Sequence, residues 1–490
     1  MTKVNTLGAL RESGWRSRPV RDEMRENLLA KLRAGETIFP GIVGYDKTVV
    51  PQIVNAILSR HHFILLGLRG QAKSRIIRQL YTLLDDYMPI IQGTYLNEDP
   101  LNPISPRARK MVADLGDETP IEWRSSLERF HEKLATPDVS IADLIGDIDP
   151  IKAAREKLDI SNEEVIHWGI VPRTNRGIFA INELPDLQPR IQVGLLNILE
   201  ESDIQVRGFP LRVPLDLVLV FSANPEDYTN RGNIITPLKD RIDSQIITHY
   251  PRTVAEARQI TASEASIATD EVTVPDFLRD ILEEVTFEAR ESEYVDQASG
   301  VSARVSISAF ENLISNVERR ALAVGDNDNY PRMCDLYATI PSVTGKIELV
   351  YEGEQEGAIL VAHNLIGQAI NKVFLEYFPL PVKGRQNPDA PPPENPYEAV
   401  VDFFSTGQKL ELADDMPFAD YKKALESIAG LKQIVTQHFP TRDEREMLLR
   451  MELVLEGLYH NNVIAREEVD SMVRYADIFS DMLKGMGGAR

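Results

Sequence analysis

Short apolar runs alternate with longer helical patterns over the first half of the chain. The clearest runs occupy residues 62–66, 177–181 and 217–221, and each is almost continuously apolar. A strand that is buried on both faces of a parallel sheet requires such a run, and the helical stretches between the runs can serve as crossover connections. We therefore expect an α/β fold, with a parallel sheet and flanking helices, between residues 39 and 250.

The second half of the chain follows the helical period. Patterns rich in Ala, Glu and Arg predict helices over 253–266 and 308–323, residues 346–351 alternate like a short strand, and 360–377 predict another helix. Proline-dense residues, including Pro391–Pro393, favour an extended linker. We expect six segments: a charged helical lead-in (1–38), an α/β core (39–250), a helical lid (251–345), a lid extension (346–377), a proline-rich linker (378–396) and a helical C-terminal domain (397–490).

Composition limits the classes of function. The 490 residues exceed the size of a single hydrophobic core, and the net charge of −21 disfavours general nucleic-acid binding. Cys334 is the only cysteine, so an intrachain disulfide framework is excluded. The N-terminus lacks the apolar segment of a signal peptide, and no stretch approaches about 18 apolar residues. We expect a cytoplasmic protein that neither binds nucleic acid nor inserts into a membrane.

A phosphate-binding loop follows the first apolar run and precedes a helical stretch. In such a loop the backbone N–H groups surround the phosphates of ATP, Lys73 reaches the terminal phosphates, and Ser74 ligates Mg²⁺. Alanine stands at position 72 where the pattern usually has glycine, and we expect the loop to tolerate it if the backbone there keeps a negative φ. The residues expected to bind the nucleotide here are Gly67, Arg69, Gly70, Gln71, Ala72, Lys73 and Ser74.

The next two apolar runs also end in polar residues. Glu183 could polarise the attacking water, and Asn182 stands where an aspartate usually supports Mg²⁺. Asn182 brings no negative charge, so an aspartate there is expected to raise turnover if the missing charge is limiting. Asn224 could orient the water beside the γ-phosphate, although asparagine before proline is also a common turn. Arg241 fits an arginine finger for a neighbouring subunit, with a surface ion pair as the alternative.

These motifs occur in the order and at the intervals of one known family. Together with residues 39–44, 143–149, 169–177 and 205–214, the chain resembles the AAA+ subunit of magnesium chelatase and the related MoxR-type ATPases over about residues 39–323. The resemblance implies an AAA+ P-loop core with an α-helical lid and an α-helical C-terminal domain. It places Val43 and Gly44 at the adenine pocket and a β-hairpin at 205–214.

The resemblance also implies the roles of individual residues and the assembly. It assigns Arg304 to the γ-phosphate of its own subunit and leaves residues 95–139 and those after 345 unmatched. It further implies a homo-oligomeric ring, expected to be hexameric, with ATP at the subunit boundaries and a partner that carries a von Willebrand factor A domain. The ATPase roles then fall on Lys73, Ser74, Glu183, Asn224, Arg241 and Arg304.

Three functions remain open at this point. The chain could hydrolyse ATP to remodel a partner protein or a metal-insertion complex. Ala72 and Asn182 favour instead a nucleotide-gated scaffold with little turnover. Magnesium insertion into a porphyrin follows only from the family, and a shared fold is weak support for a shared substrate.

Overall fold

The chain divides into two compact units, Met1–Tyr250 and Pro251–Arg490, which are described separately. The structure is a computed structural model. It describes residues 4–156, 163–206, 212–225, 233–267, 269, 271–326, 328–381, 395–469 and 472–478.

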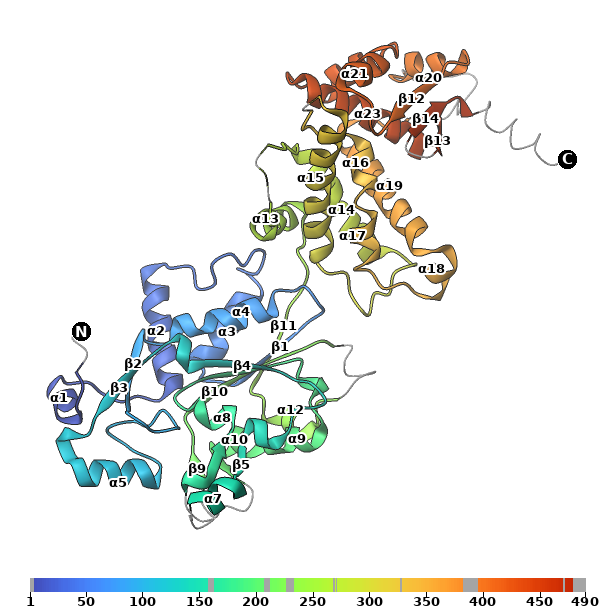
Figure 1. The fold of residues 1–490 in the computed structure, drawn as a ribbon. Helices are drawn as coiled ribbons and strands as arrows, with labels where there is room; N and C mark the ends of the chain where they lie inside the picture. Colours follow the sequence, from blue (N-terminus) through green and yellow to red (C-terminus); the bar gives the residue numbers. More distant parts are fainter. Residues whose placement is uncertain are drawn as a thin grey trace. The chain divides into compact units, whose positions relative to one another are not determined.

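A five-stranded parallel sheet forms the centre of the first unit (Figure 1). Its order is β11 (Ser244–Ile247), β1 (Phe63–Leu66), β10 (Leu217–Ala223), β7 (Gly177–Asn182) and β4 (Phe130–Leu134). The three apolar runs become β1, β7 and β10, which confirms the predicted fold class. The two edge strands, β4 and β11, carry polar residues and were not predicted.

Helices cover both faces of this sheet (Figure 1). One face packs against α2 (Val20–Ala34), α3 (Val49–Leu58) and α4 (Lys73–Gln79), which continues as the 3-10 turn η1 (Leu80–Leu83). The other face packs against α8 (Ile170–Arg173), α9 (Pro189–Gly194), α10 (Leu196–Glu200) and α12 (Thr236–Arg241). Alternate residues of the central strands therefore enter two separate hydrophobic cores.

Smaller elements complete the first unit. β2 (Tyr87–Ile91) pairs with β3 (Ile121–Ser125), β5 (Gly146–Ile148) with β6 (Ile166–Trp168), and β8 (Asp203–Gln205) with β9 (Arg212–Pro214), all antiparallel. The last pair lies at the expected β-hairpin, although residues 207–211 lie outside the described residues. The remaining helices and 3-10 turns are α1 (Leu7–Glu12), α5 (Pro106–Leu115), η2 (Gly116–Glu118), η3 (Leu127–Arg129), α6 (Ile141–Leu144), α7 (Pro150–Glu156), η4 (Glu163–Val165) and η5 (Leu184–Asp186).

The charged lead-in is built into the first unit. Val20, Met24 and Leu28 of α2 lie in the core beneath the sheet. On the same helix, the buried carboxylate of Glu23 receives two hydrogen bonds from the guanidinium of Arg129, at 2.6 and 2.7 Å. Because Arg129 is fully buried just before β4, this ion pair ties the lead-in to the edge of the sheet.

The second unit is mainly helical and has one continuous hydrophobic core, from Val274 to Tyr475. The expected boundaries at 345, 377 and 396 therefore do not separate cores among the described residues. A three-stranded antiparallel sheet, in the order β12 (Leu410–Ala413), β14 (Met472–Ala476), β13 (Ala465–Val469), was not predicted. The helices are α13 (Val254–Glu264), α14 (Asp276–Glu291), α15 (Arg304–Val324), α16 (Met333–Tyr337), α17 (Ile340–Thr344), α18 (Tyr351–Glu356), α19 (Ala358–Tyr377), α20 (Glu398–Ser405), α21 (Phe418–Glu426), α22 (Leu431–His438) and α23 (Glu444–His460).

Helix α19 is the centre of this core. Among the described residues it is long and apolar enough to cross a membrane by length and composition, contrary to our expectation that no stretch comes close. Half of that apolar stretch is buried inside the protein. The helix crosses α23 closely, because a Cβ on Gly457 would lie 2.3 Å from the ring of Phe374.

Two other expectations for this unit have different outcomes. The strand predicted at 346–351 is wrong, because Leu349 forms only an isolated bridge with Val295 and α18 begins at Tyr351. The alternation arises instead from Ile347 packing into the core between half-buried Lys346 and exposed Glu348. The proline-rich linker, including Pro391–Pro393, falls mostly on residues 382–394, outside the described residues.

Candidate nucleotide-binding site

The predicted motifs converge at one edge of the first sheet. All five strands are parallel, so their carboxyl ends share this edge. The phosphate loop leaves β1, Asn224 follows β10, and Glu183 follows β7. Ligands of open α/β sheets bind at this edge, so the strand order brings together residues that are far apart in the sequence.

The beginning of the phosphate loop is held by side chains from outside it. The hydroxyl of Tyr45 lies 2.6 Å from the carbonyl oxygen of His249 and 3.0 Å from that of Gln71, so it joins the loop to the residues after β11. Tyr250 donates a hydrogen bond to the carbonyl oxygen of Arg69 at 2.9 Å. Burial raises the pKa of Tyr45 to about 12, so its hydroxyl keeps the proton that it donates. At Gly67 a Cβ would lie 1.8 Å from Oγ1 of Thr248, so only glycine fits there.

Lys73 and Ser74 open helix α4, as the motif predicts. The ammonium group of Lys73 donates hydrogen bonds to the carbonyl oxygens of Gly67 and Leu68, the second at 2.9 Å. Ser74 is exposed, so its hydroxyl faces solvent. Gly70 has a φ of 74°, which glycine adopts without strain. The loop thus places an ammonium group and a hydroxyl beside a tight backbone turn.

Ala72 does not meet the condition under which we expected the loop to tolerate alanine. That condition was a negative φ, and the observed φ is 57°, in the left-handed region. An alanine in this region costs about 1–2 kcal/mol because its Cβ approaches the following carbonyl group. The loop therefore keeps the geometry of a glycine at this position and bears the strain of the methyl group.

Asn182 and Glu183 end β7 in an ordered arrangement. Asn182 is 9% exposed and its Oδ1 accepts a hydrogen bond from the hydroxyl of Ser222 at 3.2 Å. The backbone N–H of Glu183 donates to the same hydroxyl oxygen at 3.3 Å. Glu183 has a φ of 59°, a second strained backbone position at this edge. Such outliers concentrate at functional sites.

The remaining site residues lie in different places. Asn224 lies half-buried after β10, and Val43 and Gly44 lie next to Tyr45, which contacts the loop. Arg241 forms an ion pair with Glu200 at 2.6 Å, so in this single chain its guanidinium is occupied. Arg304 begins α15 in the second unit and is therefore described apart from the loop.

Sequence reasoning missed several residues that shape this edge. Tyr45, Thr248 and Tyr250 support the loop, and Glu132 of β4 contacts Asn182 with 3.2 Å between Oε2 and Nδ2. Each stands outside the motifs, and Glu132 lies in the stretch that the family resemblance left unmatched. Residues 130–134 place three consecutive polar residues between Phe130 and Leu134, so no alternating pattern indicated a strand there.

The residues at this edge fit ATP and Mg²⁺ by their chemistry. A loop in which a Cβ at Gly67 finds no room brings backbone N–H groups close to a phosphate chain. The hydroxyl of Ser74, the amide oxygen of Asn182 and the carboxylate of Glu132 are hard oxygen donors of the kind that Mg²⁺ prefers. No group of three or more His, Cys, Asp or Glu side chains suited to a metal ion occurs among the described residues.

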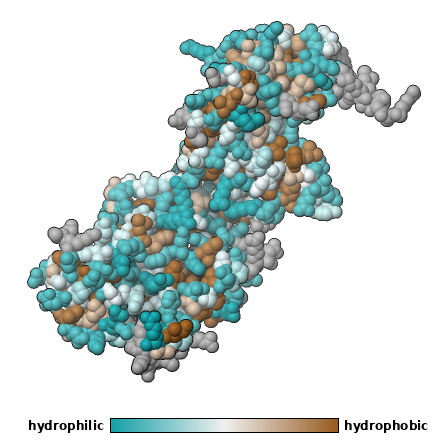
Figure 2. Space-filling model, viewed as in Figure 1, coloured by the Kyte–Doolittle hydropathy of each residue, from teal (hydrophilic) through white to brown (hydrophobic). Residues whose placement is uncertain are grey.

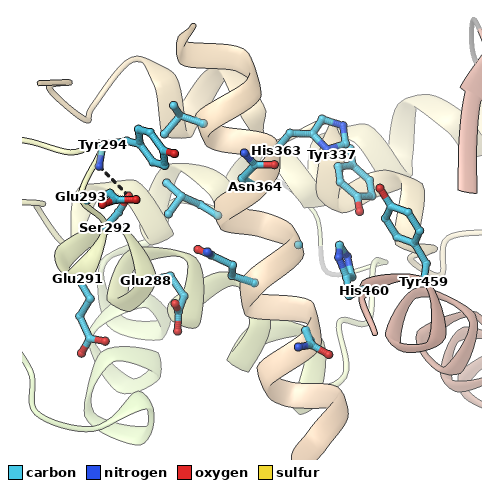
Figure 3. Close-up of a pocket in the computed structure, with 15 residues that line it drawn as sticks. Glu288, Glu291, Ser292, Glu293, Tyr294, Tyr337, His363, Asn364, Tyr459 and His460 are labelled. Atoms are coloured by element: carbon cyan, nitrogen blue, oxygen red, sulfur yellow. Dashed lines mark hydrogen bonds between the residues drawn. The ribbon is translucent and has the colours of Figure 1, made fainter. Parts of the chain in front are cut away.

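A pocket of about 820 Å³ lies in the second unit. Figure 3 shows Glu288, Glu291 and Glu293 to one side of α19 and the rings of Tyr337, Tyr459, His363 and His460 to the other. Glu288 contacts Lys372 at 3.1 Å, and His363 stacks on Tyr337 with ring centroids 4.4 Å apart. Tyr459 also contacts His460, with ring centroids 4.8 Å apart. The face of the protein that Figure 2 shows is mostly hydrophilic, with scattered apolar patches.

No protein-family model matches the chain. The chain is similar to a crystal structure from Cytophaga hutchinsonii named provisionally as an ATPase, at 16% identity and a TM-score of 0.31 over 71% of this chain and 95% of that one. It is also similar to the BchI–BchD complex of magnesium chelatase, at 18% identity and a TM-score of 0.34 over 65% and 98%. For NtrX from Brucella abortus in complex with ATP the values are 15% and 0.36, over 71% and 68%.

The assignment of the fold rests on this chain's own sheet. The strand before the phosphate loop lies between β11 and β10, and the strand that ends in Glu183 lies beyond β10. This arrangement puts the loop and the acidic strand end on either side of Asn224. The first unit therefore has the parallel α/β fold that the sequence predicted for a nucleotide-binding core, with the phosphate loop after a central strand.

Proposed function

We propose that this protein is an ATPase that binds ATP–Mg²⁺ at the subunit interfaces of a ring and uses hydrolysis to remodel a partner protein or a metal-insertion complex. The observation that carries the proposal is the convergence of Lys73, Glu183 and Asn224 at one edge of a parallel sheet. Motifs separated by more than a hundred residues meet there, which a chance phosphate-loop pattern would not produce.

The residues have separate roles in the proposed reaction. Lys73 and the loop backbone bind the phosphates, Ser74 and Asn182 would hold Mg²⁺, Glu183 orients the attacking water, and Asn224 contacts the γ-phosphate side. Mg²⁺, when bound, neutralises charge on the phosphates. The pairing of Lys73 with the carbonyl oxygens of Gly67 and Leu68 supports its role, because a phosphate would replace these weaker partners of the ammonium group.

The ring is proposed from Arg241. Its ion pair with Glu200 is partly exposed, so little free energy is needed to release the guanidinium toward a neighbouring subunit. In a hexamer this arginine would reach the nucleotide of the next subunit, and Arg304 that of its own. The family resemblance favours a partner with a von Willebrand factor A domain. Insertion of magnesium into a porphyrin is one of the reactions that such a complex could carry out.

Steady-state ATP hydrolysis with Mg²⁺ tests the proposal. Wild-type protein is expected to turn over ATP, and Glu183→Gln to lower the rate about a hundredfold or more. Lys73→Ala is expected to weaken nucleotide binding about tenfold. Unchanged affinity in Lys73→Ala would remove the assignment of the phosphate loop.

Mixing experiments test the shared site. Arg241→Ala should retain ATP binding and lose turnover, and mixed rings with Glu183→Gln should recover part of the activity if each site draws on two subunits. Rates that simply average the two variants would contradict a ring with shared sites.

A nucleotide-gated scaffold is the second candidate. The strained backbone of Ala72 and the uncharged side chain of Asn182 favour it. In that case ATP binds and promotes assembly, but hydrolysis stays at the level of the Glu183→Gln blank. Nucleotide binding by equilibrium titration, measured together with hydrolysis on the same preparation, separates the two candidates.

A further inference from the structure

Glu132 contacts the strand end that lacks an aspartate. It lies on the edge strand β4, whose register pairs Leu134 with Asn182. Because alternate residues of a strand share a face, Glu132 and Leu134 point to the same face as Asn182. This is the face covered by α4, since the carboxylate of Glu132 pairs with Arg78 of that helix at 2.9 Å. Glu132 therefore lies between the helix of the phosphate loop and the end of β7.

The contact orients the amide of Asn182. Nδ2 of Asn182 donates a hydrogen bond to Oε2 of Glu132 at 3.2 Å. A carboxylate can only accept, so it selects the nitrogen of the amide and turns the amide oxygen away. That oxygen then accepts from the hydroxyl of Ser222, which in turn accepts from the backbone N–H of Glu183. The chain of contacts runs from Glu132 to the backbone of the residue that orients the attacking water.

The same contact explains why an amide stands at position 182. An aspartate there would bring a second carboxylate to about the distance of the present hydrogen bond, and two adjacent carboxylates disfavour each other's charge. An amide next to a carboxylate has no such conflict. The pair therefore carries one negative charge in total, which is the charge of the usual strand-end aspartate.

Building on the proposed function, we propose that Glu132 replaces the missing aspartate: it supplies the negative charge beside the magnesium site and orients Asn182 as a positioning residue. The expectation that Asn182→Asp alone raises turnover is thereby revised, because the new carboxylate would face Glu132. The matched variant, called the exchange variant, therefore combines Glu132→Gln with Asn182→Asp and keeps one carboxylate and one amide at this contact.

A purely structural role for Glu132 is the alternative. The side chain of Arg78, which pairs with Glu132, is 63% exposed. Exposed ion pairs contribute about 0–1 kcal/mol to the free energy of unfolding. If this pair were the whole role, Arg78→Gln and Glu132→Gln would have equal effects. If Glu132 acts through Asn182, Arg78→Gln should leave the magnesium dependence unchanged.

The test measures how Mg²⁺ changes the affinity of the full-length protein for a fluorescent ATP analogue. In wild-type protein the affinity should rise with Mg²⁺, and in Glu132→Gln this gain should fall about tenfold or more. The exchange Glu132→Gln with Asn182→Asp should recover most of the gain, since one carboxylate and one amide remain. Asn182→Asp alone, measured without Mg²⁺, should unfold at a lower temperature than the exchange variant.

Each outcome decides between the proposals. An unchanged magnesium dependence in Glu132→Gln, together with weakened nucleotide binding in Lys73→Ala, would overturn the role of Glu132 and leave the proposed function in place. A wild-type protein that does not bind the analogue at all would remove both. If Glu132→Gln does not fold by circular dichroism, the exchange variant decides: it supports the role if it folds with a normal magnesium dependence, and overturns it if it folds without one.

Discussion

The two units use charged and strained groups in opposite ways. Seven non-glycine residues in the described part of the chain have a positive φ, and six of them lie in the first unit. Two of these six, Ala72 and Glu183, lie at the proposed site. In the second unit, burial raises the pKa of Tyr475 well above its usual value, and its hydroxyl donates a hydrogen bond to the buried carboxylate of Glu456 at 2.5 Å.

The difference shows which signals indicate a site. Shifted pKa values often mark active sites, but buried structural networks shift them equally. A network of four charged side chains connects α15 with α16 and is almost fully buried. It consists of Arg320, Asp328, Arg332 and Asp335. Its members pair with one another inside the core, whereas Glu183 and Asn224 at the strand ends of the first unit are half-buried, and the backbone of Glu183 is strained. We therefore place the proposed site at the strained edge of the sheet and not at the buried charged network.

The largest expected loss of stability follows from a substitution in α2, the helix of the lead-in to the first unit. Glu23→Ala leaves the fully buried Arg129 without its partner, which should destabilise the unit by about 3–5 kcal/mol. All three tryptophans, Trp15, Trp123 and Trp168, lie in this unit, so fluorescence during denaturation reports on it alone. Glu26→Ala, at an exposed pair with Arg18, is the control and should change stability by less than about 1 kcal/mol. Equal effects would show that α2 is not an integral part of the unit.

The second unit should be most sensitive where α19 crosses α23. Gly457→Ala introduces a methyl group 2.3 Å from the buried ring of Phe374, and overpacking of this kind costs about 1–3 kcal/mol. The far-ultraviolet circular dichroism transition should shift while tryptophan fluorescence stays constant. Adding Phe374→Leu makes room and should restore part of the loss. A shift in the fluorescence transition would mean that the two units do not unfold separately.

The two units should respond to pH with opposite signs. Burial, with Arg21 nearby, lowers the pKa of His62 to about 3, so the folded first unit excludes a proton that the unfolded chain binds below pH 6.5. Its stability is present above pH 6.5 and is lost as the pH falls. Burial raises the pKa of Glu452 to about 7, so the second unit has its full stability below pH 4.5 and loses it as the pH rises.

From pH 5 to pH 7 each group should change the stability of its unit by about 2 kcal/mol, upward for the first unit and downward for the second. Hydrogen exchange of the full chain, corrected for intrinsic exchange at each pH, measures both units in one experiment. His62→Gln and Glu452→Gln remove the two titrations and serve as controls. Parallel pH responses of the two units would refute the contrast.

The smallest expected change in stability tests whether the backbone at Ala72 is strained. Ala72→Gly removes the methyl group from a left-handed residue and should stabilise the first unit by about 1 kcal/mol. Ala180→Gly, at an extended and buried position of β7, is the matched control and should destabilise it. If both substitutions destabilise the unit, the loop does not store the strain that its φ indicates.

The sequence alone was sufficient for the local features. Continuous apolar runs predicted β1, β7 and β10, because a central parallel strand is buried on both faces. Lys73 and Ser74 follow β1 directly, so their place at the start of a helix depended only on neighbouring residues. The apolar pattern over 360–377 predicted most of α19 for the same reason. The order of the motifs also predicted a nucleotide-binding α/β core.

Only the tertiary structure decided which distant residues meet. Glu132 reaches Asn182 because β4 pairs with β7, and five polar and apolar residues of an edge strand carry no signal of that partner. Ala72 has a left-handed φ, against alanine's own preference, in a loop whose neighbouring residue Gln71 contacts Tyr45 and Thr248. The second unit has one core because its helices pack across the predicted boundaries. Short-range patterns determine elements, whereas pairing and packing between distant elements determine the site.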